Sequence, residues 1–406
     1  MRFALAFITL FMLNLGYMDL PQSIYLGLIL IYSLFSLVFL ITDKGQFAFY
    51  LKNSLIFVIF FIIIYSYLKT NNPNASIKVI VLNVINWTIC FFYFTNFILY
   101  SIRRNYNPFL MLAYSFATLM FLNLFLFLFT SRNISSNPDI ENLLIKLITG
   151  ISMEKIIFTL GPLSGAHAAI LIVILSPFLF LIKNRKLKYL SLIGACISLV
   201  LLDNRMSLLA LILSLALFFP LKKVKLSFVS KLIVIIIPFS VMIILVILPL
   251  LPTFSGLDYF SRNSEEILTA NSRTLIWISI LDVISTINTQ TLFGVGDYGN
   301  LFFNNSSDYL SLFINYKDSS VKSSHNTYLQ IILDKGYFFL ILFYYFLINY
   351  LNNLFKRKND KTIQPFIISI FIFLLSGTTE VLIGGYYFPT TFYLLAMPLY
   401  INNVVK

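Results

Sequence analysis

The residues best suited to chemistry lie in one long polar stretch, from Pro252 to Asn326, of a chain that is otherwise almost wholly apolar. Arg273 lies early in this stretch and His325 lies near its end. Arginine presents a planar fork of donors that fits phosphate, and histidine titrates near neutral pH and can act as a general base. These residue types predict a site that binds an anionic group and carries a general base.

Three expected helix starts combine such side chains with free backbone N–H groups, which favour anions. The first places Arg205 in the opening turn of a helix that Asp203 or Asn204 can cap. A second helix, over about 272–288, carries Arg273 and Trp277 four residues apart and therefore on one face. His325 opens the third helix. The first two have structural alternatives: an arginine that reaches lipid headgroups, and a helix that lies on the membrane surface.

Further candidates lie outside these three helix starts. His167 falls one turn inside an expected span, where it is either a packed, hydrogen-bonded histidine or part of the site. Glu380 ends the sequence Gly377-Thr378-Thr379-Glu380 and is either a helix cap or a site acid. The segment Gly294-Val295-Gly296-Asp297 indicates a turn, because a lone pair of glycines is a weak phosphate signal. No Asp-x-Asp pair predicts a metal site, and we expect no metal and no cofactor.

The composition is that of a membrane protein. Of the 406 residues, 59% are hydrophobic and only 11% are charged, whereas soluble domains carry about 25% charged residues. The formal net charge of +13 is explained by basic residues in short loops that orient the helices, so nucleic acid is not an expected partner. Cys90 and Cys196 both lie in apolar runs and are expected to pack there.

The expected fold is all-α and polytopic, with about twelve spans on the criterion of about 20 apolar residues per helix. Arg2 and the apolar run after it resemble a signal peptide, but no small-residue cleavage site follows, so this run is taken as the first span. The expected spans are residues 3–18, 23–42, 53–69, 77–101, 107–130, 163–182, 187–202, 205–220, 230–251, 336–355, 363–378 and 381–402.

The distribution of lysine and arginine orients these spans. Basic residues concentrate in every second loop, which predicts cytoplasmic termini and a periplasmic location for the opposite loops. Two outer segments are large, 131–162 and 252–325, and the second joins spans nine and ten. Residues 1–406 are therefore expected to form a single membrane domain with one large periplasmic loop at 252–325. Asp334 and Lys335 place 325–335 above the bilayer.

The pattern resembles the O-antigen polymerase and O-antigen ligase family of bacterial envelopes, over roughly residues 160–380. The resemblance rests on Asp203-Asn204-Arg205, Ser272-Arg273 with Trp277, Gly294-Val295-Gly296, His325-Asn326-Thr327-Tyr328-Leu329 with Gly336, and Thr379-Glu380. These motifs are weak singly, and their order within about twelve spans makes them fairly specific.

The resemblance implies a polytopic C-type glycosyltransferase of the bacterial inner membrane. Such an enzyme takes a glycan from undecaprenyl pyrophosphate at the periplasmic face, needs no metal and inverts the anomeric centre. Carried over by position, Arg205 and Arg273 hold the pyrophosphate, His325 activates the acceptor hydroxyl, and Asn326 orients His325 or the sugar. Trp277, His167, Tyr328 and Glu380 are supporting or substrate-binding candidates. Expected partners are the lipid-linked oligosaccharide, membrane lipids and a chain-length regulator protein.

A polymerase and a ligase share this donor and differ in acceptor, which is another lipid-linked repeat or lipid A core. Ligases often carry a small or polar residue three positions after the glycine that follows His-Asn; Gly336 fits that pattern and Phe339 departs from it. The His-Asn-Thr-Tyr-Leu string is common among polymerases, and polymerase is the favoured prediction. The alternatives are a polysaccharide flippase or transporter, a metal-dependent glycosyltransferase using Asp19, and a structural scaffold.

Overall fold

The computed structural model describes residues 46–72, 75–130, 142–153, 156, 165–223, 227–247, 273–303, 323–384 and 388–404, and within these ranges the regular structure is helical, with no strand. The first half contains α3 (Gln46–Lys52), α4 (Ser54–Leu68), α5 (Ile77–Arg103), α6 (Pro108–Thr130), α7 (Leu143–Thr149), α8 (Gly165–Leu175), the 3-10 helix η1 (Ser176–Leu181), α9 (Arg185–Leu202), α10 (Arg205–Lys223) and α11 (Ser227–Ile247). The second half contains α13 (Arg273–Ser285), α14 (Thr289–Phe293), α15 (Gly299–Phe302), α17 (Thr327–Lys356), α18 (Gln364–Ser376) and α19 (Phe388–Val404).

The apolar runs form helices close to the expected bounds. The run expected at 163–182 is divided into α8 and η1, because Pro177 has no N–H to continue the α-helical pattern. Among the described helices, three are long and apolar enough to cross a membrane: Ile77–Arg103, Pro108–Phe129 and Thr327–Lys356. Shorter apolar helices, such as α4 and α18, pack beside them. The part of the chain that the structure describes is all-helical, as expected of a polytopic membrane protein. The count of about twelve spans and the orientation remain predictions. The expected spans 3–18 and 23–42 lie outside the described residues.

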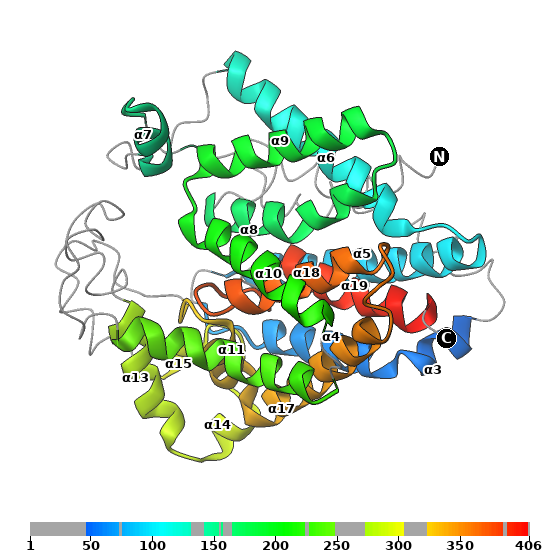
Figure 1. The fold of residues 1–406 in the computed structure, drawn as a ribbon. Helices are drawn as coiled ribbons and strands as arrows, with labels where there is room; N and C mark the ends of the chain where they lie inside the picture. The colour runs from blue at the N-terminus through cyan, green and yellow to red at the C-terminus, as the bar shows by residue number, and fades with distance from the viewer. Residues whose placement is uncertain are drawn as a thin grey trace.

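Figure 1 shows the arrangement of the helices. Two clusters of buried aromatic and aliphatic side chains hold them together. In the larger core α5 packs against α4 and α19, and α10 packs against α8 and α18. Aromatic rings pack against one another in this core; for example, Trp87 stacks on Phe388 with ring centroids 4.5 Å apart. A smaller core joins α13 to the start of α17 through Ile276, Trp277, Ile280, Ile284, Leu329, Ile332 and Leu333. This second core fixes the helix that carries Arg273 against the helix that follows His325.

The helix α17 is broken at Gly336, whose φ of 83° is non-helical. A Cβ at this position would lie 2.2 Å from the Leu292 carbonyl oxygen, so only glycine fits. The approach is mutual, because a Cβ at Gly294 would lie 2.3 Å from the Asp334 carbonyl oxygen. The glycine segment 294–297 therefore packs against the backbone of α17. The break coincides with the expected start of the tenth span.

Candidate active site

Two of the predicted site residues, Arg273 and His325, meet at the carboxylate of a third, Glu380. Arg273, the first residue of α13, places Nη2 2.7 Å from Glu380 Oε1. His325 lies just before α17 and places Nδ1 3.5 Å from Glu380 Oε2. The Thr327 hydroxyl donates to the Glu380 carbonyl oxygen at 2.7 Å, which ties the turn after α18 to the start of α17. The structure thus joins residues that are 107 and 55 positions apart in the chain.

The charges around Glu380 keep it ionised. Burial alone would raise the pKa of this carboxyl, but the Arg273 guanidinium, the hydrogen bond from His325 and the charges of His325 and His167 lower it to about 2. Because an ionised carboxylate only accepts hydrogen bonds, a proton on His325 Nδ1 completes this contact. The second ring nitrogen, Nε2, is then left as a base. The His325 side chain is 39% exposed, whereas those of Arg273 and Glu380 are only 18% and 14% exposed.

The backbone around His325 is held in an uncommon conformation. His325 has a φ of 49°, which lies in the left-handed region that non-glycine residues rarely adopt. On its N-terminal side, Trp277 Nε1 donates to the Ser324 carbonyl oxygen at 2.9 Å. On its C-terminal side, Asn326 caps α17 by accepting hydrogen bonds from the Tyr328 and Leu329 N–H groups. The helix therefore begins at Thr327, two residues later than the predicted start at His325.

Three of the supporting candidates are internal to the fold. Asn326 is fully buried, and its Nδ2 donates to the Thr378 carbonyl oxygen at 3.1 Å. The Tyr328 hydroxyl donates to the Leu374 carbonyl oxygen at 3.1 Å. Trp277 is likewise fully buried in the smaller core. In this structure all three position the turn that carries His325 rather than offering a surface to a ligand.

Arg205 and His167 come from helices that pack next to this group. Arg205 is half-buried at the first residue of α10, and Asn204 caps the helix by accepting a hydrogen bond from the Ser207 N–H at 2.9 Å. Asp203 instead ends α9, with a left-handed φ of 44°. His167, on α8, acts on the charge of Glu380. Because α10 packs against both α8 and α18, the three helices form one group, in which the approach of Arg205 to His325 remains a prediction.

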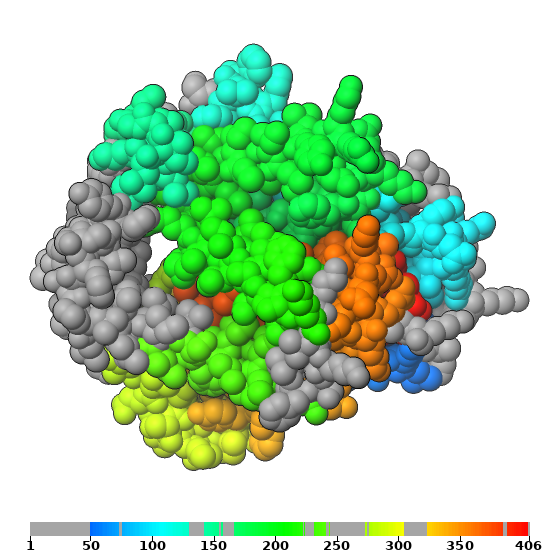
Figure 2. All heavy atoms as spheres, in the orientation of Figure 1, coloured from blue at the N-terminus to red at the C-terminus, as the bar shows by residue number. Residues whose placement is uncertain are grey.

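The figures show how these helix ends are arranged. In Figure 1, α7, α13 and the turn between α9 and α10 lie on the same side of the molecule. Figure 2 shows a hollow between α10 and α11, in which orange-red atoms of the α18 segment are visible. Both α10 and α11 pack against α18. The turn that carries Glu380 follows α18 directly.

Comparison with known proteins finds a family that is similar to the middle of the chain. Residues 190–344 match a protein-family model described as O-antigen ligase. This segment is similar to the O-antigen ligase family. No curated protein matches the chain. The match confirms the resemblance to the O-antigen polymerase and ligase family, and it contains Arg205, Arg273 and His325; His167 and Glu380 lie on either side of the O-antigen ligase segment.

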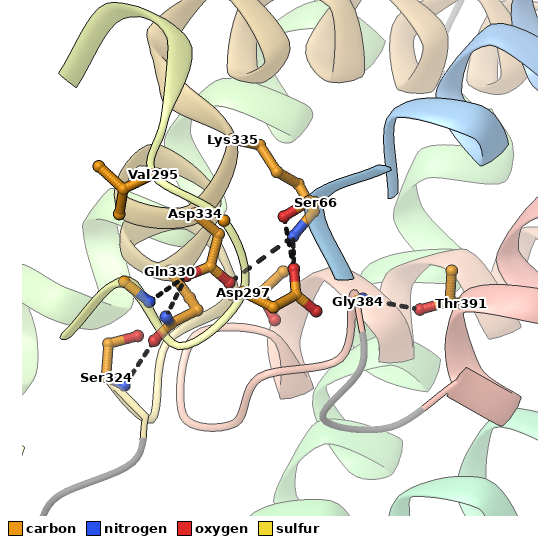
Figure 3. Close-up of polar contacts among 12 residues, drawn as sticks. Ser66, Val295, Asp297, Ser324, Gln330, Asp334, Lys335, Gly384 and Thr391 are labelled. Atoms are coloured by element: carbon orange, nitrogen blue, oxygen red, sulfur yellow. Dashed lines mark hydrogen bonds and ion pairs between the residues drawn. The ribbon is translucent and has the colours of Figure 1, made fainter. Parts of the chain in front are cut away.

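The O-antigen ligase segment also contains a buried group of charges that sequence reasoning missed (Figure 3). Lys335 Nζ lies 2.8 Å from Asp297 Oδ1 and 3.6 Å from Asp334 Oδ2, and all three side chains are at most 1% exposed. The Ser66 hydroxyl, from α4, donates to Asp297 Oδ1 at 2.5 Å. From Asp334 and Lys335 the sequence predicts that 325–335 lies above the bilayer, and this stays a prediction, whereas the burial of both side chains was not predicted. The structure buries them, because the partner that neutralises Lys335 comes from the glycine segment 38 residues away.

Proposed function

We propose that this protein is a surface-polysaccharide (O-antigen) polymerase. It transfers a glycan from undecaprenyl pyrophosphate to a sugar hydroxyl of another lipid-linked repeat unit, at the periplasmic face of the bacterial inner membrane. The observation that carries the proposal is the contact of Arg273 and His325 with Glu380, within and beside a segment that matches the O-antigen ligase family. This contact brings together a base (His325), a carboxylate that orients the base (Glu380) and a cation suited to phosphate (Arg273).

The acceptor hydroxyl is activated at His325. Glu380, whose pKa is about 2, accepts the Nδ1 proton and holds the imidazole so that Nε2 faces away from the carboxylate. Nε2 takes the proton of the acceptor hydroxyl as its oxygen attacks the anomeric carbon. The bond between that carbon and the pyrophosphate oxygen breaks on the opposite side, which inverts the configuration. Undecaprenyl pyrophosphate leaves, and the imidazolium returns its proton to solvent.

The leaving pyrophosphate is stabilised by arginine. The Glu380 contact occupies only the Nη2 group of Arg273, and the guanidinium carries five N–H donors in total. The remaining donors can bind phosphate oxygens while Glu380 holds the side chain in place. Arg205 supplies a second guanidinium from the start of α10, where the helix dipole adds to the positive potential.

A ligase is the second candidate function, because the matching family model is described as O-antigen ligase. A ligase uses the same donor and transfers the glycan to lipid A core. The residues around Glu380 serve either reaction equally, since both deprotonate a sugar hydroxyl and release the same pyrophosphate. The preference for polymerase rests on the His-Asn-Thr-Tyr-Leu string at 325–329 and on Phe339.

The test is His325→Ala expressed in the native host in place of the normal gene, with glycan ladders on lipopolysaccharide as the readout. A polymerase variant leaves lipid A capped with single repeats, and a ligase variant leaves no capped lipid A. Asp360→Asn is the matched control, because Asp360 forms a comparable carboxylate–arginine pair with Arg357 before α18, whereas Glu380 lies after that helix. Unchanged ladders at normal expression of His325→Ala would remove His325 from the reaction and overturn the proposal.

A further inference from the structure

The turn that carries His325 is anchored by the side chain of Gln330. Gln330 Oε1 accepts a hydrogen bond from the Ser324 N–H at 2.8 Å, and Gln330 Nε2 donates to Asp334 Oδ1 at 2.7 Å. Both side chains are almost fully buried, as is Ser324 (Figure 3). Ser324 immediately precedes His325 in the chain. Gln330 therefore links the backbone next to the proposed base to the buried charge group.

The charge group fixes which way the Gln330 amide points. Asp334 accepts at the same Oδ1 atom from the Gly299 N–H at 2.8 Å, so this oxygen is an acceptor toward both of its partners. The Gln330 NH2 group must therefore face Asp334, which leaves its oxygen for Ser324. Asp334 is held in turn by Lys335, and Lys335 by Asp297. The Gln330 side chain is thus joined to Asp297 through two hydrogen bonds, at Gln330 and at Lys335, and one ion pair between Asp334 and Lys335.

The far end of this chain of contacts lies on α4. Asp297 accepts from the Ser66 hydroxyl at 2.5 Å, and its backbone N–H donates to the Ser66 carbonyl oxygen at 3.0 Å. The network therefore runs from α4, through the glycine segment and the start of α17, to the turn at His325. A buried network of this kind is disrupted when one partner is removed.

We infer that Gln330 is a positioning residue of the glycosyl transfer, which sets the place of the His325 ring by fixing the Ser324 N–H against Asp334. The inference rests on the proposed function, because it assigns Gln330 a role through the base at His325. Ser324 is held by Gln330 at its N–H and by Trp277 at its carbonyl oxygen, and the next residue takes the left-handed φ of 49°. Without the Gln330 contact, this uncommon conformation loses the anchor at the Ser324 N–H, while the contact with Trp277 and the hydrogen bonds of the Ser324 hydroxyl remain.

The inference predicts that transfer requires a hydrogen bond between the side chains at positions 330 and 334, and that the donor and acceptor can be exchanged. Gln330→Glu removes the NH2 group that donates to Asp334 Oδ1, and it places a second carboxyl group against Asp334. In the double variant Gln330→Glu with Asp334→Asn, the new amide at position 334 can donate to the new carboxylate at position 330. The double variant therefore restores a donor–acceptor pair and keeps the net charge of the group, while the carboxylate at position 330 is still able to accept from Ser324.

The experiment measures transfer by the purified full-length protein in detergent, with lipid-linked oligosaccharide extracted from the native host as donor and acceptor. We expect Gln330→Glu to lower kcat about 10–100-fold, the loss typical of a catalytic group displaced by about 1 Å, while KM for the donor changes less than about two-fold. The double variant should recover at least about ten-fold of that loss, because the hydrogen-bond polarity is restored. Melting temperatures establish that each variant is folded.

A matched control separates positioning from general stability. Asn53 is a buried amide that donates to the Phe49 carbonyl oxygen at 2.8 Å, about 20 Å along α4 from Ser66. Asn53→Ala should lower the melting temperature without lowering kcat. Wild-type kcat in Gln330→Glu, or a double variant no better than the product of the two single losses, would overturn the inference. If Gln330→Glu does not fold, Gln330→Met removes both hydrogen bonds without adding charge, and wild-type kcat in that variant would overturn it equally.

His325→Ala in the same assay keeps the two hypotheses apart. An inactive His325→Ala with a fully active Gln330→Glu rejects the positioning role and leaves the proposed function standing. An active His325→Ala rejects the proposed function itself, and the positioning role then fails with it.

Discussion

Replacing Glu380 with glutamine tests whether this carboxylate orients the base or only holds the fold. Glutamine keeps the shape but removes the charge that meets Arg273 and His325. Its NH2 group can face Nδ1, which favours the tautomer that carries its proton on Nε2 and is therefore unable to act as the base. Loss of the correct tautomer in a catalytic triad costs about 10⁴-fold, and a general base contributes about 10²–10⁴-fold. The 3.5 Å contact between Glu380 and His325 is long, so we expect a loss near 10²-fold.

The same substitution has a separate effect on stability. The pKa of Glu380 is lowered from 4.5 to about 2, which corresponds to roughly 3 kcal/mol of favourable interaction at neutral pH. Glu380→Gln should therefore melt at a lower temperature than wild type at pH 7 as well as react more slowly. The two effects are measured on one sample, by thermal unfolding in detergent and by transfer of lipid-linked oligosaccharide under saturating donor.

Asp360→Asn supplies the comparison, because it removes a carboxylate from an arginine pair away from the site. That pair is about one-third exposed and is expected to change kcat little. If Glu380→Gln melts at a lower temperature and keeps the kcat of wild type, the carboxylate is a structural partner of Arg273 alone. The orientation of His325 by Glu380 is then wrong.

Three further predictions follow from described contacts. Arg273→Lys and Arg205→Lys should each lower kcat/KM at least about ten-fold in the transfer assay, since an ammonium cannot form a bidentate contact with phosphate; full activity in both would reject pyrophosphate binding. Because the pKa of Glu380 is depressed, its stabilisation is present above about pH 4.5 and is lost as the pH falls toward 2, so the difference in melting temperature between wild type and Glu380→Gln should narrow over that window. Gly336→Ala places a Cβ 2.2 Å from the Leu292 carbonyl oxygen and should abolish the monodisperse peak in size-exclusion chromatography, whereas Gly150→Ala, with open space around its Cβ, should not.

The helices were predictable where long apolar runs lie between polar residues. The expected spans 77–101, 107–130 and 205–220 correspond closely to α5, α6 and α10, because each run is continuous and ends at a charge or a turn. The cap at Asn204 also follows from its residue type. The short helices α14 and α15 were not expected, since four or five residues carry no periodic pattern.

The candidate site was predictable in its residue types and only partly in its contacts. His325 and Arg273 are conspicuous because the chain has two histidines and few charges. Their meeting at Glu380 was not predictable, since partners 55 and 107 positions apart leave no local pattern. The burial of Lys335 was missed for a similar reason: a lysine beside an aspartate predicts a water-facing surface, and its neutralising partner Asp297 comes from another segment.

The break at Gly336 divides α17 into a short first part, which follows the turn at His325, and a long second part. From Tyr337 to Lys356 the helix is about 30 Å long, which is about the thickness of the hydrocarbon core of a bilayer. The turn at His325 is joined to this long helix by the close packing of Gly294 and Gly336 against the facing backbone and by the buried charges. Its position along the helix axis is therefore fixed. Under the proposed function, the thickness of the surrounding bilayer sets the depth at which a lipid-linked pyrophosphate meets His325. Membranes of different thickness then place the same headgroup above or below the proposed base.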